Sequence, residues 1–197
     1  MLYLSGVVRP DMPAMLTPDI GNRIPEEQQW AADNGCFTQP KRYSDERYLA
    51  WLVKQTYALD RCLFATAPDV VGDAVATLAR SMPMLPRIRE AGYPAALVAQ
   101  DGLTPDMVPW DDIDALFIGG TTEFKESEAA FSLCQEARAR GKWVHMGRVN
   151  SAKRLRYAHE IGCDSADGTF ISFAPTENLG RMLAWLDKLH PTLEGIY

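Results

Sequence analysis

Residues 95–120 read AALVAQDGLTPDMVPWDDIDALFIGG, and this stretch decides the fold class. Two short apolar runs, Ala95–Ala99 and Ala115–Ile118, each end in glycine or polar residues. Elsewhere in the chain, similar runs pass into segments with the 3.6-residue period of a helix. Alternation of short apolar runs with helical patterns is expected of parallel βα units, so we assign the chain to the α/β class.

The same alternation continues along the chain. It predicts strands at Tyr3–Val8, Gln29–Ala32, Cys62–Ala65, Ala95–Ala99, Ala115–Ile118, Trp143–Met146 and Cys163–Ala166, with Phe170–Phe173 as a weaker eighth. Seven or eight parallel strands in a chain of 197 residues predict a compact TIM-like (β/α) barrel, and an open doubly wound sheet is the competing topology. Both topologies bind ligands at the carboxyl ends of the strands.

The spacing of apolar residues also predicts the helices. One helical face carries Ala130, Leu133, Cys134 and Ala137, and another carries Leu179, Met182, Leu183 and Leu186. Thr176 is the expected N-cap of the last helix. Pro83 and Pro86 predict two short helices or a sharp kink between Val75 and Ala91.

We expect one domain, residues 1–197, containing a long loop over residues 9–28. That segment has four prolines and little periodicity, and long loops of this kind are more often functional or mobile than structural. The composition, 47% hydrophobic and 23% charged, is that of an ordinary globular domain. The net charge of −6 argues against non-specific nucleic-acid binding over the whole surface, although a local basic patch remains compatible with it.

The cysteines and the N-terminus bound the chemistry and the compartment. Cys36, Cys62, Cys134 and Cys163 are widely separated and form no C-x-x-C pair, so we expect reduced thiols, no metal and no cofactor. The first residues lack a basic segment and a long apolar run, and no stretch is apolar enough to span a bilayer. These features predict a cytoplasmic protein without a membrane partner.

Polar residues or glycines follow six predicted strands in succession. They are Asp33-Asn34-Gly35-Cys36-Phe37, Asp69, Gln100-Asp101-Gly102, Gly119-Gly120, Gly147-Arg148 and Asp164-Ser165-Ala166-Asp167. Any one of them is explained by a turn, where Asp, Asn and Gly are common. The full set instead predicts a binding site, because the carboxyl ends of parallel strands meet at one face.

Two carboxylates of this set, Asp33 and Asp167, would converge from nonadjacent strands. Pairs of this kind serve glycosyl transfer, in which one carboxylate attacks the anomeric carbon and the other handles protons. Asp164 offers a third carboxylate. Strand alternation puts Asp164 on the same face as Ala166, so Asp164 is alternatively a buried structural acid.

At these residues, between Gln29 and Phe173, the sequence resembles the tRNA-guanine transglycosylase superfamily, particularly the DNA 7-deazaguanine transglycosylase branch of phages and genomic islands. The segment Asp33–Phe37 is similar to the family's D-S-G-G-F, with Asn34 in place of the serine. Ala67-Pro68-Asp69 stands at the family's base-reading aspartate, Gln100-Asp101-Gly102 resembles Q-G-G, and Ile118-Gly119-Gly120 resembles I-G-G. Met146-Gly147-Arg148 resembles M-G-V-G, and Gly162–Asp167 resembles G-x-D-x-x-D.

The resemblance implies a pentosyltransferase that exchanges guanine for a 7-deazaguanine-type base. Asp167 is implied as the nucleophile and Asp33 as the proton-handling carboxylate. Asp69, Gln100, Gly119 and Gly120 are implied as readers of the purine or 7-deazapurine base, with Met146 or an aromatic residue over its face. Phe37, Arg148 and Asp164 complete the expected binding residues.

One departure from the family concerns the nucleic acid. The zinc-binding C-x-C-x-x-C segment of the tRNA enzymes is absent, and Gly168 stands where those enzymes have a cysteine. The resemblance therefore favours DNA over tRNA as partner. A nucleoside hydrolase or free-base exchanger, or a non-catalytic base-binding protein, is the alternative, and a homodimer would be one source of additional binding surface.

Seven cations fall between residues 138 and 156 without an acidic residue among them: Arg138, Arg140, Lys142, Arg148, Lys153, Arg154 and Arg156. Such a run is either a solvated helix face or a track for phosphates. Arg148 is the expected phosphate or substrate contact, because it alone follows a predicted strand.

Overall fold

The computed structural model describes residues 1–9, 11–19 and 23–189. Eight parallel strands close into a barrel in the order in which they occur in the chain. The strands are β1 (Leu2–Ser5), β2 (Ala14–Leu16), β3 (Trp30–Ala32), β4 (Cys62–Thr66), β5 (Ala95–Ala99), β6 (Ala115–Ile118), β7 (Trp143–Met146) and β8 (Ser165–Gly168). The fold is therefore the TIM-like α/β barrel that the sequence predicts, and not the open sheet.

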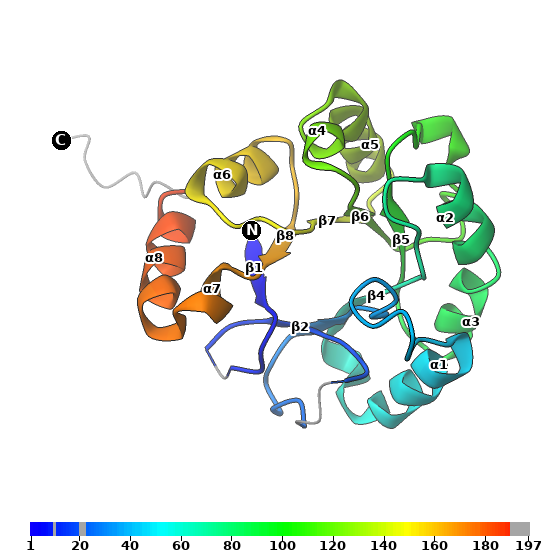
Figure 1. Cartoon of the computed structure of the whole chain (residues 1–197), viewed down its shortest axis with the longest axis horizontal. Coiled ribbons are helices and arrows are strands. Elements are labelled where there is room, and N and C mark those ends of the chain that lie inside the picture. The colour runs from blue at the N-terminus through cyan, green and yellow to red at the C-terminus, as the bar shows by residue number, and fades with distance from the viewer. Residues whose placement is uncertain (10, 20–22, 190–197) are drawn as a thin grey trace.

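Helices surround most of the ring of strands (Figure 1). They are α1 (Asp45–Lys54), α2 (Ala74–Ser81), α3 (Leu85–Glu90), α4 (Thr122–Lys125), α5 (Glu128–Ala139), α6 (Ala152–Glu160), α7 (Phe170–Phe173) and α8 (Pro175–Asp187). Two short 3-10 helices, Thr56–Arg61 and Pro105–Met107, precede β4 and β6. None of the helices in the described part of the chain has the length and apolarity needed to cross a bilayer.

The barrel is small because its first two strands are followed by loops. The described residues of the two loops, one between β1 and β2 and one between β2 and β3, form turns and extended segments. Met12 from the first loop and Ile24 from the second are buried in the outer core. Tyr3, Leu16 and Trp30 belong to the same core cluster. Buried loop residues thus cover strands that a helix would otherwise shield.

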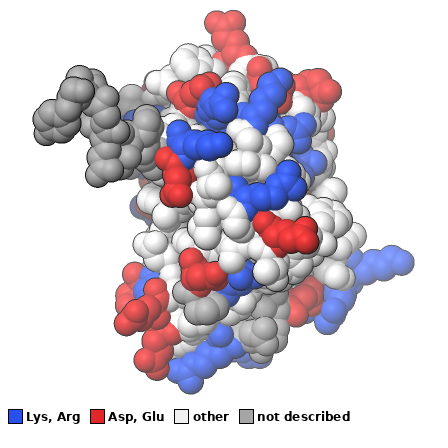
Figure 2. Space-filling model, turned by 90° about the vertical axis from the view of Figure 1, so that its left-hand side faces the viewer, with Lys and Arg blue, Asp and Glu red and all other residues white. Residues whose placement is uncertain are grey.

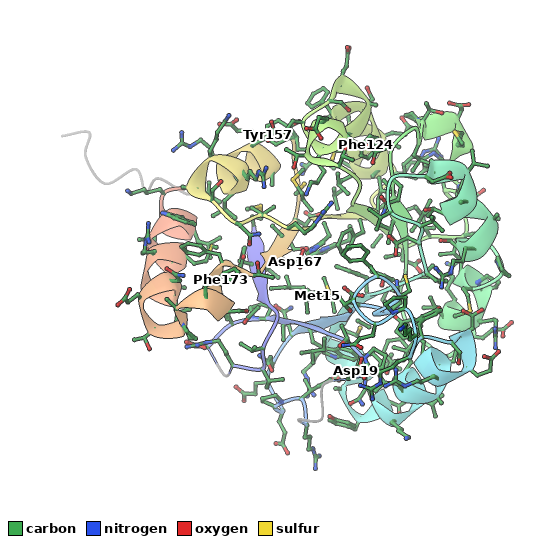
Figure 3. The ribbon with its side chains drawn as sticks, in the orientation of Figure 1. Met15, Asp19, Phe124, Tyr157, Asp167 and Phe173 are labelled. Atoms are coloured by element: carbon green, nitrogen blue, oxygen red, sulfur yellow. The ribbon has the colours of Figure 1, made fainter. Side chains whose placement is uncertain are left out.

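Strand alternation separates two cores. Side chains on the outer face of the strands pack against the helices, while Leu4, Met15, Ala31, Phe64, Ala96 and Ala115 form a second cluster. Met15 lies inside the ring of strands in Figure 3, which assigns this second cluster to the barrel interior. The alanines of β3, β5 and β6 leave the interior space to Phe64 and Met15.

The local predictions hold for several elements. β5, β6 and β7 have the predicted bounds, and α2 and α3 are the two short helices expected around Pro83 and Pro86. The face of α5 formed by Ala130, Leu133, Cys134 and Ala137 is fully buried.

Several local predictions are wrong. The strand predicted at Tyr3–Val8 is Leu2–Ser5, and Leu183 on the apolar face of the last helix is exposed. Residues 9–28 are not entirely loop, because β2 lies within them and pairs with both β1 and β3. Phe170–Phe173 is the short helix α7 and not a strand. The last strand begins at Ser165, two residues later than predicted, and α8 begins at Pro175 with no side-chain cap from Thr176.

Candidate functional site

A cavity of about 280 Å³ opens at the carboxyl ends of the strands. Eight of the ten predicted site residues line it: Asp33, Phe37, Asp69, Gln100, Gly119, Gly120, Arg148 and Asp167. The other lining residues are Asn34, Thr38, Thr66, Val71, Val98, Phe117, Gly147 and Thr169. Residues from all parts of the chain after β2 therefore meet at one site, as the shared polarity of parallel strands requires.

Asp167 is the third residue of β8 and points into the ring of strands (Figure 3). Its Oδ1 lies 3.2 Å from His145 Nε2 and accepts a hydrogen bond from the Arg148 backbone N–H at 3.2 Å. Arg148 has a φ of 58°, in the left-handed region that a non-glycine residue rarely adopts. Backbone strain of this kind is often stored at functional sites, and here it accompanies the hydrogen bond to Asp167.

Asp33 follows β3 and is partly buried. Its Oδ1 accepts a hydrogen bond from the Gly35 N–H at 2.7 Å, which closes a tight local turn. Burial raises the pKa of Asp33 to about 6, and the negative charges of Asp167 and Asp69 add to the rise, whereas the Gly35 N–H opposes it. A carboxyl with this pKa is able both to donate and to accept a proton near neutral pH.

Asn34 holds the Asp33 loop against the end of β4. Its Nδ2 donates to Thr66 Oγ1 at 3.0 Å and to the Ala67 carbonyl at 3.1 Å, and its Oδ1 accepts from the Cys36 N–H at 2.7 Å. The side chain is buried. Both amide hydrogens and the amide oxygen of Asn34 are thus bonded within the protein, and Asn34 fixes the loop that carries Asp33.

Asp69, after β4, and Gln100, after β5, form a pair joined by a hydrogen bond between their side chains. Gln100 Nε2 donates to Asp69 Oδ2 at 2.6 Å, and Gln100 Oε1 accepts from the Gly72 N–H at 2.9 Å. The Cys36 thiol donates to Asp69 Oδ1 at 3.3 Å. Asp69 is therefore oriented by two side chains, while Gln100 keeps one amide hydrogen for a ligand.

The backbone approaches the cavity closely at two glycines. A Cβ on Gly119 would lie 2.8 Å from Val98 Cγ1 and 3.0 Å from Gln100 Nε2. A Cβ on Gly147 would lie 2.6 Å from the Phe117 ring. Side chains at these positions would displace Gln100 and Phe117, so both glycines keep the floor of the cavity open.

The two amides of Gly119 and Gly120 are not equivalent. Gly119 N–H donates to the Ala99 carbonyl at 2.9 Å and is already occupied. Gly120 has a φ of 73°. Asp101 holds the following residue through bonds to the Thr121 N–H at 2.8 Å and hydroxyl at 2.5 Å. Asp101 thus connects the loop after β5 to the loop after β6. Of the two glycine amides, only the Gly120 N–H remains a candidate for binding a base.

Apolar side chains complete the cavity wall. Phe117 lies on β6, and Phe37, Val71 and Val98 come from other segments. Phe37 is 64% exposed and stands at the rim. Flat apolar walls around a few fixed polar groups are typical of small-molecule sites, and the volume lies at the lower end of their usual range of roughly 300–1,000 Å³.

Two predicted site residues lie elsewhere. Met146 is 2% exposed and belongs to the outer core between the barrel and the helices, so it does not cover the cavity. Asp164 precedes β8 at the amino end of the barrel, where its Oδ2 accepts from the Val144 N–H at 2.8 Å. Asp164 is thus a structural acceptor for the start of β7, although it is only partly buried and not the buried acid of the alternative.

The structure adds a buried pair that the sequence reasoning missed. His145 and Ser165 are both 0% exposed and lie next to Asp167, on neighbouring strands in direct register. The sequence pattern that could have identified Ser165 is the period-2 alternation of a strand, which puts Ser165 and Asp167 on one face of β8. Phe117 was missed as a lining residue in the same way, whereas Gly147 belongs to the predicted set of strand ends.

The basic segment between residues 138 and 156 is divided by the fold. At the amino end of the barrel, Arg138 donates to the Gly162 carbonyl and Lys142 to the Ile113 carbonyl, while Arg140 pairs with Glu136 on α5. Arg148 lines the cavity, with its guanidinium bonded to the Gly120 carbonyl. The side of the molecule that carries α6 and α8 has acidic and basic side chains interspersed (Figure 2). The run is therefore not one continuous basic track.

No family model matches the sequence, and no curated protein matches it. Solved structures do match. One is a crystal structure of tryptophan synthase from M. tuberculosis in an aminoacrylate- and BRD0059-bound form, with a TM-score of 0.51 and 15% sequence identity. The match covers 90% of this chain and 60% of that chain. At this identity the likeness establishes the barrel fold alone.

Proposed function

We propose that the protein is a pentosyltransferase that exchanges guanine for a 7-deazaguanine-type base in nucleic acid, with DNA favoured over tRNA. The observation that carries the proposal is one apolar-walled cavity lined by two carboxylates, Asp33 and Asp167, and by the joined pair Asp69–Gln100. The carboxylates supply glycosyl-transfer chemistry. The pair supplies the acceptor and donor that the edge of a guanine requires.

In the first half of the reaction, Asp167 attacks C1′ of the nucleoside. The C1′–N9 bond breaks as the bond from C1′ to the carboxylate oxygen forms, and the electron pair leaves with guanine. Asp33 donates its proton to the departing base. The raised pKa of Asp33, about 6, keeps a useful fraction of this carboxyl protonated near neutral pH.

In the second half, the ionised Asp33 takes a proton from the incoming base. The nitrogen of that base attacks C1′, and the ester bond to Asp167 breaks, so the carboxylate is regenerated. One carboxyl therefore serves as acid and then as base, with no net change in protonation. Exclusion of water from the cavity while the ester exists favours transfer over hydrolysis.

Recognition of the base follows from the donors and acceptors in the cavity. Asp69 offers carboxylate oxygens to the N1–H and exocyclic amine of guanine. The remaining amide hydrogen of Gln100 and the Gly120 N–H are donors for the O6 carbonyl. A base that left these buried groups unpaired would bind more weakly by the cost of their desolvation.

The acceptor must present an unpaired nucleotide. The cavity holds a base and not a duplex, so a guanine in double-stranded DNA has to be flipped out of the stack. Arg148, exposed at the cavity, would contact a phosphate beside the flipped nucleotide. DNA is favoured because the chain lacks the zinc segment of the tRNA enzymes.

Exchange of radiolabelled guanine into polymer tests the proposal. The full chain is incubated with labelled guanine and, separately, with single-stranded DNA, duplex DNA and unmodified tRNA. We expect label in DNA for the native protein and for Asp111→Asn, an exposed aspartate before β6, and none for Asp167→Asn. Release of guanine without incorporation would indicate a hydrolase, and binding of guanine with neither reaction would indicate a non-catalytic base-binding protein.

A further inference from the structure

A chain of hydrogen bonds runs through the barrel interior beneath the cavity. Trp143 Nε1–H donates to Ser165 Oγ at 2.8 Å, Ser165 Oγ lies 2.8 Å from His145 Nδ1, and His145 Nε2 lies 3.2 Å from Asp167 Oδ1. The four residues alternate between β7 and β8, which pair through His145 and Ser165. Trp143 begins β7 at the amino end of the barrel, so the chain extends from that end to the nucleophile.

The chain has a direction that follows from the chemistry of its members. An indole nitrogen donates only, so Ser165 Oγ accepts from Trp143. The serine hydroxyl then has its own hydrogen to donate, and His145 Nδ1 is the acceptor within reach. With Nδ1 as acceptor, the neutral imidazole carries its proton on Nε2, which faces the carboxylate of Asp167.

The opposite tautomer is unfavourable at this place. A proton on Nδ1 would turn the lone pair of Nε2 toward Asp167 Oδ1 and would leave the serine hydrogen without this acceptor. The ring also packs against two neighbouring phenyl rings, Phe64 at 5.1 Å and Phe117 at 4.5 Å between ring centroids. Full burial of His145 removes water as a substitute partner.

A serine hydrolase is not a fitting interpretation of this serine, histidine and aspartate. Ser165 is 0% exposed inside the barrel, so its hydroxyl does not reach a substrate in the cavity. Asp167, not Ser165, lines the cavity. The carboxylate is therefore the reactive end of the chain, and the serine is its support.

We propose that His145 is a positioning residue: locked in its Nε2–H tautomer by Ser165 and Trp143, it binds Oδ1 of Asp167 and so directs Oδ2 at the substrate. The Arg148 backbone N–H bonds to the same Oδ1 at 3.2 Å, so both donors hold one oxygen and leave the other for attack. A Cβ on Gly147 would lie 3.4 Å from that Oδ1, which shows how closely this side of the carboxylate is enclosed. The attack itself rests on the proposed function, whereas the tautomer does not.

The first test measures the tautomer in the free protein. Long-range ¹H–¹⁵N NMR spectra of the native chain distinguish a protonated Nδ1 from a protonated Nε2, and the sequence has 3 histidines. Loss of one signal set in His145→Gln assigns His145. We expect the Nε2–H form in the native protein and a mixture of tautomers in Ser165→Ala. An Nδ1–H form in the native protein overturns the proposal, whatever the protein's reaction is.

The second test measures the reaction. In single-turnover guanine exchange, His145→Phe keeps an aromatic ring packed against Phe64 and Phe117 but loses the donor, and His145→Gln keeps a donor. We expect a rate loss on the order of 10²-fold for His145→Phe, as for a small misplacement of a reacting group. The Kd for guanine should be unchanged, and His145→Gln should recover part of the rate.

The possible outcomes distinguish the positioning role of His145 from the proposed function. An unchanged rate in a folded His145→Phe contradicts the positioning role even if native exchange is robust. A smaller loss in His145→Phe than in His145→Gln contradicts it as well, because a packing role predicts that the retained ring preserves the rate. Absence of exchange in the native protein contradicts the proposed function alone, since the NMR measurement still decides how His145 is held.

Discussion

Asp33 and Asp167 line the same cavity but differ in the donors that reach their carboxylates. Asp33 accepts one N–H from its own loop, from Gly35, whereas Asp167 Oδ1 faces a buried imidazole and a strained backbone amide. Different surroundings for two neighbouring carboxyls are what separate roles as proton carrier and nucleophile require. This difference supports the roles that we propose for the two residues.

The raised pKa of Asp33 predicts a pH-dependent stability. The pKa of Asp33 in the folded protein is about 6, whereas the pKa of a free aspartate side chain is 3.8. The folded state therefore binds more protons in this window, and the free energy of unfolding falls as pH rises through it. Asp33→Asn keeps an oxygen for the Gly35 N–H but cannot ionise. We expect it to be more stable than the native chain at pH 7, by on the order of 3 kcal/mol, while losing turnover.

Urea unfolding at a series of pH values checks this prediction. The difference in unfolding free energy between Asp33→Asn and the native chain should shrink toward zero as pH falls from 7 to 4. A difference that stays constant over this range would show that Asp33 does not titrate as the burial argument requires. Loss of stability in Asp33→Asn would identify the residue as a structural turn acid.

The sequence predicted cavity residues that follow apolar runs, including Asp167, which the structure places inside β8, and it missed His145 and Ser165. Asp33, Asp69, Gln100 and Gly119–Gly120 could be predicted because a polar residue after an apolar run has a known place in a parallel barrel. His145 and Ser165 look like ordinary members of a strand, and only the pairing of β7 with β8 brings them beneath Asp167. Met146 was misplaced because its role was taken from the resemblance, whereas alternation with the interior His145 turns its side chain to the outer core.

Among the elements, β2 and α7 show where local patterns fail. β2 has only three residues and lies among prolines, so it has no periodicity to detect. It exists because Ala14, Met15 and Leu16 find partners in β3, a tertiary requirement of closing the barrel. Phe170–Phe173 has the composition of a strand but follows β8 directly, where the closed barrel has no further position. Tertiary context therefore decided both elements.

Gly147, directly after β7, allows a prediction about the effect of adding one methyl group. Gly147→Ala would place a Cβ 2.6 Å from Phe117, a contact that real structures do not tolerate, so the ring or the strand end must shift. We expect a loss of stability of about 1–3 kcal/mol and loss of exchange activity. Gly180→Ala is the matched control, because nothing lies within 4 Å of its Cβ and it is inside α8.

Thermal and urea unfolding of the two alanine variants give the comparison. Gly180→Ala should gain about 0.5–1 kcal/mol from helix propensity and keep its activity. If Gly147→Ala retained both native stability and native exchange, the enclosed cavity floor described for β7 would be wrong.

In the whole molecule, closure of the barrel brings the residues of the site together. β1 pairs with β8, so Asp167 near the C-terminal part of the chain faces residues from β3 to β6 across one opening. The parallel arrangement could be predicted from the rhythm of apolar runs, but closure needed the unpredicted β2 as well as the correct β8. The resemblance to transglycosylases concerns the residues at this opening, while the likeness to solved structures concerns the barrel alone.

The central claim is that Asp167 becomes covalently bound to a sugar of the nucleic acid. The most direct measurement incubates the full chain with end-labelled, guanine-containing DNA, resolves the products on a denaturing gel, and maps the modified peptide by mass spectrometry. We predict a labelled protein–DNA band whose modification lies on Asp167, present in Asp111→Asn and absent in Asp167→Asn. No band with the native chain under conditions that support guanine exchange, or a modification on another residue, would contradict the account.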